Sequence, residues 1–143
     1  MEDLKAKIRC ASFVYYVLCG MSIILVIALL FVISMIGLLF SLYTFMLFLL
    51  GLKGYQLSFY ENKHLATAYM VMSIVSCVFN FVWGLLNLVE VSIYNDAENT
   101  VTVLCFFAAS AFSAYTSVLG WKYRAFLNSQ VFSALQHLDP AKV

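Results

Sequence analysis

Apolar residues fill most of the chain, and the few charged residues divide it into long uninterrupted runs. The first run carries no charge from Cys10 to Leu52. As one helix it would be about 65 Å long at 1.5 Å per residue, whereas a hydrocarbon core is roughly 30 Å thick. The run must therefore fold back once. We place the reversal at residues 34–37, Ser-Met-Ile-Gly, the segment near its middle that has both a serine and a glycine.

Two further apolar runs follow Lys63, and an acidic segment over residues 90–100 separates them. The pattern predicts an all-α membrane protein with four transmembrane helices in a compact antiparallel bundle, as a single domain over residues 1–143. The predicted spans are residues 11–33, 37–55, 65–89 and 101–121.

The charged residues divide between the two sides of these spans. All eight Lys and Arg residues fall on one side: Lys5, Lys7, Arg9, Lys53, Lys63, Lys122, Arg124 and Lys142. The opposite side has only Glu90, Asp96 and Glu98. Basic residues concentrate on the cytoplasmic side of membrane proteins. Both termini are therefore expected on the cytoplasmic or matrix side, and the pattern leaves open an endomembrane or the mitochondrial inner membrane.

The composition, 64% apolar and 10% charged, leaves too little polar surface for a soluble globular domain. The basic side suits anionic lipid headgroups, and no compact basic patch points to nucleic acid. We expect membrane lipids and other membrane protein subunits as partners, and no nucleic acid. Tyrosines and tryptophan are expected to gather at the basic interface. They are Tyr15, Tyr16, Tyr55, Tyr60, Trp121 and Tyr123.

Small and weakly polar residues form a stripe along the third span at spacings of three and four residues: Ser73, Ser76, Asn80, Gly84 and Asn87. In lipid, small residues allow helices to approach closely, and Ser or Asn side chains bond between them. The alternative is a polar pocket at Asn80 and Asn87 for a headgroup or a small solute. Helix packing is favoured, because two amides without a charged neighbour make a poor transport site.

Residues 122–138 are predicted to form a C-terminal amphipathic helix that ends at Asp139-Pro140. Its apolar face comprises Leu127, Val131, Phe132, Leu135 and Leu138. This tail is expected to lie on the membrane or to dock on a partner subunit. The alternative is simple continuation of the fourth helix beyond the bilayer.

No spacing of His and Cys typical of a metal site and no nucleophile motif occurs in the chain. We therefore expect no catalytic residues, no cofactor and no metal, and thus no enzyme. Cys10, beside Arg9, is a candidate for S-palmitoylation, and the alternative is a cysteine that acts as a small apolar residue.

Three functions fit these expectations. The first is a non-catalytic accessory or scaffold subunit of a larger membrane complex. The second follows from the layout, with both termini in the cytoplasm, which resembles small four-span proteins of the vesicle-trafficking and MARVEL-domain type. That resemblance implies a protein that organises lipid or cargo. The third is a small solute transporter or channel that uses the Asn80/Asn87 face.

Overall fold

The computed structural model describes residues 1–30, 34–94 and 97–137, all but a few of them helical. The helices are α1 (Glu2–Leu30), α2 (Ser34–Phe59), α3 (Lys63–Tyr94) and α4 (Ala97–His137). No strand occurs in these ranges, so the prediction of an all-α chain is confirmed.

The helices extend further than the predicted spans. Residues 34–37, predicted as the reversal, instead form the first turn of α2, so that prediction is wrong. The predicted acidic loop is likewise helical on both flanks, as α3 continues to Tyr94 and α4 begins at Ala97. Hydropathy marks where a helix leaves the lipid, whereas backbone hydrogen bonds let it continue into water.

The start of α3 has a clear local cause. The side-chain Oδ1 of Asn62 accepts a hydrogen bond from the backbone N–H of His64 at 2.9 Å. The carbonyl of Asn62 accepts the first helical bond, from Ala66 N at 3.0 Å. Asn62 is therefore the N-cap of α3, because its side chain satisfies a backbone donor that the helix leaves free.

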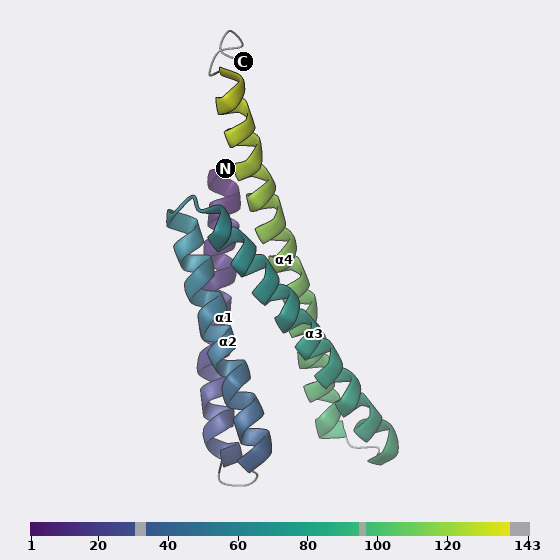
Figure 1. Cartoon of the computed structure of the whole chain (residues 1–143). Coiled ribbons are helices and arrows are strands. Elements are labelled where there is room, and N and C mark those ends of the chain that lie inside the picture. Colours follow the sequence, from purple (N-terminus) through teal and green to yellow (C-terminus); the bar gives the residue numbers. More distant parts are fainter. Residues whose placement is uncertain (31–33, 95–96, 138–143) are drawn as a thin grey trace.

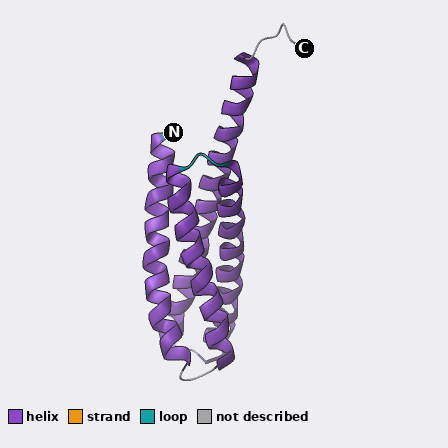
Figure 2. Cartoon of the chain, turned by 60° about the vertical axis from the view of Figure 1, so that its left-hand side comes forward, coloured by secondary structure: helices purple, strands orange, loops and turns teal. Residues whose placement is uncertain are grey.

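The tail is not a separate element. Residues 122–137 continue α4 as one helix of 41 residues, about 60 Å long. The structure therefore corresponds to the alternative in which the fourth helix simply continues. Its C-terminal part projects beyond the other three helices (Figures 1 and 2).

The helices pair as two hairpins, α1 with α2 and α3 with α4, and most contacts between helices lie within these pairs. The hairpins meet at the end that carries the start of α1 and the α2–α3 connection, which we call the basic end (Figure 1). They separate toward the opposite end, which we call the far end. The bundle is thus close-packed in one half, rather than compact throughout as predicted.

The buried apolar core lies mainly in the half toward the basic end. Its members include Ile8, Tyr15, Leu47, Leu50, Leu57, Tyr69, Tyr123 and Leu127. Gly54 allows the closest approach there. A Cβ at this position would collide with Ser12 Oγ and lie 2.8 Å from Tyr69 Cε2. Only the missing side chain of Gly54 lets α2 fit against α1 and α3 at this point.

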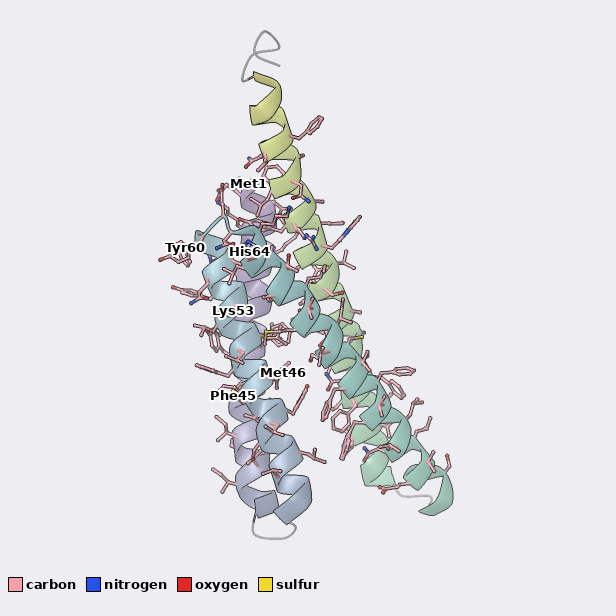
Figure 3. All side chains as sticks on the ribbon, in the orientation of Figure 1. Met1, Phe45, Met46, Lys53, Tyr60 and His64 are labelled. Carbon is pink, nitrogen blue, oxygen red and sulfur yellow. The ribbon has the colours of Figure 1, made fainter. Side chains whose placement is uncertain are left out.

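Three segments of the described chain are long and apolar enough to cross a membrane: Glu2–Ile24, Lys63–Glu90 and Thr100–Ser133. Large apolar side chains cover the outside of these helices (Figure 3). Examples are Phe13 on α1, Val78 on α3 and Leu104 on α4. A surface of this kind suits a hydrocarbon environment.

Candidate functional site: a buried polar cluster

The polar stripe of α3 faces the protein interior over most of its length. Ser73, Ser76 and Asn80 are buried. Gly84 is also buried, and a Cβ there would lie 3.4 Å from the side chain of Phe106 on α4. Residues spaced by three or four positions share one side of a helix, and this side of α3 packs mainly against α4.

Asn80 is the best-connected residue of the stripe. Its Oδ1 accepts a hydrogen bond from the Tyr43 hydroxyl of α2 at 2.8 Å. Its Nδ2 donates to the Ser76 carbonyl at 2.8 Å and to Ser76 Oγ at 3.3 Å. The amide thus binds α2 and its own helix at once, and both ends of the side chain have partners.

The bonding continues into α4 and α1. Ser76 Oγ lies 3.1 Å from Ser113 Oγ, and either hydroxyl could be the donor in this pair. Thr116 Oγ1 donates to the Ser113 carbonyl at 2.9 Å. The Tyr15 hydroxyl, 2.7 Å from Thr116 Oγ1, is therefore the donor in that pair.

These bonds bring one or more residues from each of the four helices into a buried polar cluster. Its members are Tyr15, Tyr43, Ser76, Asn80, Ser113 and Thr116. Ser73 and Tyr69 lie on the next turns of α3 and are also buried, but their hydroxyls make no hydrogen bond with the described residues. The hydrogen-bonded network therefore stops before these two turns.

Asn87 stands apart from this cluster. It is half-buried, and its Nδ2 donates to the carbonyl of Trp83 in its own helix at 2.8 Å. The structure therefore does not join Asn80 and Asn87 in one polar pocket. The cavity beside this part of α3, of about 590 Å³, is lined by apolar and aromatic side chains of α2 and α3. They include Leu39, Val78, Phe79, Val82, Trp83 and Leu86.

Stacked rings form one wall of that cavity. The Tyr43 ring stacks on Phe79 with centroids 4.7 Å apart, and Phe79 stacks on Trp83 at 6.0 Å. Tyr43 therefore belongs to both features, with its ring against this wall and its hydroxyl in the polar cluster.

Two tyrosines predicted at the membrane interface are instead in the core. Tyr15 and Tyr123 are both 0% exposed, whereas Tyr55, Tyr60 and Trp121 are exposed. The interfacial preference of tyrosine comes from its polar tip. For Tyr15 the hydrogen bond to Thr116 satisfies the hydroxyl inside the protein.

Ionised side chains gather at the basic end rather than in the cluster. Lys5 Nζ lies 2.9 Å from Glu61 Oε1, and Lys7 Nζ lies 2.7 Å from Asp3 Oδ2. The members of the polar cluster are hydroxyls and one amide, so hydrogen bonding is their available chemistry. Within the described ranges, no three His, Cys, Asp or Glu residues are grouped so that they could hold a metal ion.

The predicted tail surface is divided. Leu127 packs into the core at 8% exposure, which corrects its assignment to a partner surface. Val131 and Phe132 are exposed, at 61% and 64%. The side chain of Leu135 and the whole of Leu138 lie outside the described residues.

Cys10 is an exposed free thiol near the basic end, in a position open to modification. Cys19 is also free but buried, and its Sγ donates to the Thr44 carbonyl at 3.6 Å. Exposure thus separates the two cysteines of α1.

The sequence did not reveal the two tyrosines of the cluster. Ser76 and Asn80 stand out as polar residues in an apolar span, whereas Tyr15 is predicted at the interface, where tyrosine is enriched, and no pattern singles out Tyr43. Their signal is only that each shares a helix face with other buried residues, such as Ser12 and Cys19 around Tyr15. Neither a protein-family model nor a curated protein nor a solved structure matches the chain.

Proposed function

We propose that this chain is a four-span membrane protein that acts as a non-catalytic accessory or scaffold subunit of a larger membrane complex. Three helices are long and apolar enough to span. As the fourth span we propose α2, which has 26 residues and Lys53 as its one charged residue. A helix of this length reaches across a hydrocarbon core.

The orientation is part of the proposal. The start of α1 and the α2–α3 connection, with Lys5, Lys7, Arg9 and Lys63, lie together at the basic end (Figures 1 and 3). The positive-inside rule then favours a cytoplasmic or matrix location for this end and for both termini.

The observation that carries the scaffold role is the projection of α4 past the other helices. Beyond the core residue Leu127 this helix exposes Val131 and Phe132 side by side in sequence. A neighbouring pair of large apolar side chains on a helix that has left the bundle is typical of a docking surface. We infer that another subunit or the membrane surface covers it.

The test is a double substitution, Val131→Asp with Phe132→Asp, followed by mild detergent extraction and native electrophoresis. If the scaffold proposal is right, the large assembly is lost, because charge cannot be buried in an apolar contact without a heavy cost. The matched control is Ser129→Asp with Gln130→Asp. It adds the same charge to exposed positions roughly on the opposite side of α4. Full retention of the assembly by the Val131/Phe132 variant, or equal loss in both variants, would refute the role of this surface.

The apolar cavity between α2 and α3 favours the second candidate, a tetraspan that organises lipid or cargo. On that proposal the chain runs near its own mass or as a small oligomer in the same experiment, and the cavity holds acyl chains. The third candidate, a solute path along Asn80 and Asn87, is not favoured. Asn80 is engaged with Tyr43 and Ser76, and Asn87 bonds within its own helix.

A further inference from the structure

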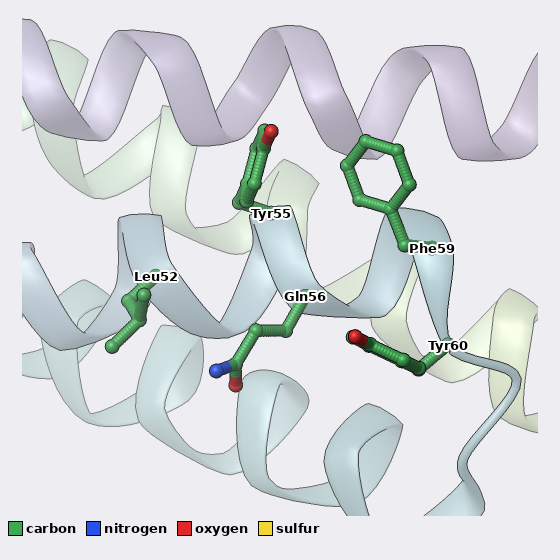
Figure 4. A pocket seen from close by; sticks show the side chains of 5 residues that line it. All are labelled: Leu52, Tyr55, Gln56, Phe59 and Tyr60. Carbon is green, nitrogen blue, oxygen red and sulfur yellow. The ribbon is translucent and has the colours of Figure 1, made fainter.

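An aromatic groove lies on α2 at the basic end, near the level where the predicted second span ends. Its volume is about 620 Å³, and its lining residues are Leu52, Tyr55, Gln56, Phe59 and Tyr60. In Figure 4, Tyr55 and Phe59 point to the side of α1, whereas Gln56 points to the other side of α2. The groove thus combines aromatic walls with an amide and two phenol hydroxyls.

A cation without an ion pair stands at one side of this groove. The Arg9 guanidinium lies over the Phe59 ring, 5.0 Å from its centroid. A guanidinium stacked on a ring keeps its N–H edge available, and that edge suits the oxygens of a phosphate group. Arg9 makes no salt bridge with any residue in the described ranges.

A second cation lies along the same helix. Lys53 precedes Gln56 by one turn and Tyr60 by two turns, so the three residues share one side of α2. Lys53 is half-buried, and it too has no salt bridge within the described ranges. Figure 3 shows it on α2, between Met46 and Tyr60.

The nearby carboxylates are already engaged. Glu61 pairs with Lys5, and Asp3 pairs with Lys7. Glu2 also approaches Lys5, at 3.9 Å. The positive charge of Arg9 and Lys53 is therefore not balanced by these carboxylates, and it favours an anion at this surface of α2.

We propose that this groove is a binding site for the phosphate headgroup of an anionic phospholipid. Arg9, over the Phe59 ring, contacts the phosphate from the α1 side of the groove (Figure 4). Lys53, on the side of α2 that carries Gln56 and Tyr60, adds positive charge on the other side, and the Gln56 amide with the Tyr60 hydroxyl contacts the glycerol region. Leu52 and the exposed Phe48 and Phe45, one and two turns further toward the far end, then carry the acyl chains. The aromatic walls and this apolar continuation favour a lipid over a free phosphate compound.

The proposal rests on the membrane location of the chain under the proposed function, but not on the docking role of its tail. The Val131/Phe132 variant described above should therefore bind lipid as the wild type does. Failure of the lipid site would not contradict docking by the tail, and failure of docking would not contradict the lipid site.

The experiment is native mass spectrometry of the delipidated full chain, titrated with three ligands. They are phosphatidylglycerol, phosphatidylcholine and soluble glycerol 3-phosphate. We expect one saturable phosphatidylglycerol adduct. In the Arg9→Gln/Lys53→Gln variant its affinity should fall roughly 30-fold, since each basic residue near an anionic surface contributes a factor of about five.

The charge-matched control is Lys7→Gln with Lys122→Gln, which removes two basic residues outside the groove and should change the affinity little. Equal affinity for phosphatidylcholine, or an equal loss in the control variant, overturns the proposal. Equally tight binding of glycerol 3-phosphate overturns the lipid as the source of the phosphate.

A second measurement needs no variant. Wild-type protein in bilayers that contain a photoreactive phosphatidylglycerol should give cross-links within residues 52–60. Cross-links spread evenly over the outer surface of all four helices would contradict a defined site.

Discussion

The hydrogen bond from Tyr43 to Asn80 joins one hairpin to the other inside the protein, at a donor–acceptor distance of 2.8 Å. In Tyr43→Phe the donor is lost, and Asn80 Oδ1 stays buried without this partner. An unsatisfied buried polar group costs about 1–3 kcal/mol. Measured hydrogen bonds between membrane helices average about 0.6 kcal/mol and reach about 1.7 kcal/mol. We therefore expect Tyr43→Phe to lower the free energy of unfolding by about 1 kcal/mol.

Asn80→Leu also removes the two bonds to Ser76, at 2.8 and 3.3 Å. Its cost should be larger, about 2 kcal/mol, since three polar contacts disappear in one step. Each single variant loses the Tyr43–Asn80 bond, and the double variant loses it only once, so the sum of the two single effects exceeds the effect of the double variant. The coupling energy of the cycle should therefore fall between about 0.6 and 1.7 kcal/mol.

The assay is equilibrium unfolding in mixed detergent micelles with increasing dodecyl sulfate, followed by the fluorescence of Trp83 in a Trp121→Phe background. Trp83 reports well because it stacks in line with Phe79 and Tyr43. Tyr115→Phe is the matched control, since Tyr115 is half-exposed and its loss should change stability by less than about 0.5 kcal/mol. A coupling energy below about 0.3 kcal/mol would show that the bond does not join the hairpins energetically.

Two further predictions concern α1 and α2. Gly54→Ala should destabilise the protein by about 1–3 kcal/mol through overpacking against Ser12 and Tyr69. A Cβ at Gly20 would have no atom within 4 Å, so Gly20→Ala should leave the free energy of unfolding unchanged or raise it. Equal destabilisation by Gly54→Ala and Gly20→Ala in the same unfolding assay would contradict the close packing at Gly54. Exposed Cys10 should react with a maleimide in detergent while buried Cys19 stays protected, as mass mapping would show. If Cys10 is palmitoylated in cells, its thiol should react with the maleimide only after hydroxylamine has cleaved the thioester. If the Cys10→Ser chain is still labelled in a hydroxylamine-dependent way, the acylated residue is not Cys10.

The helical class and the approximate position of the helices could be predicted from the sequence, because long uncharged runs suit a hydrocarbon environment. A chain in such an environment must bond every backbone group internally, which favours helices. The ends were less predictable. Ser34 and Gly37 favour a turn in water, yet both lie within α2, since Ser and Gly are also packing residues in membrane helices.

Part of the candidate site could also be predicted. Ser73, Ser76, Asn80 and Gly84 proved to be buried because a stripe on one helix depends only on spacing. Which residues meet them depends on how the helices cross. Tyr43 and Tyr15 could therefore not be found from spacing alone. Leu127 shows the same limit, because its place on an apolar face could not tell whether that face packs against the core or against a partner, and the structure places it in the core.

The pairing of helices into hairpins has a consequence for how the chain assembles. Each hairpin joins neighbours in sequence, α1 to α2 and α3 to α4, and holds most of its contacts within itself. A pair of this kind can enter the bilayer and form before the rest of the chain is present. We therefore expect the two hairpins to form before they dock on each other. The short connection that links them ends at Asn62, the N-cap of α3.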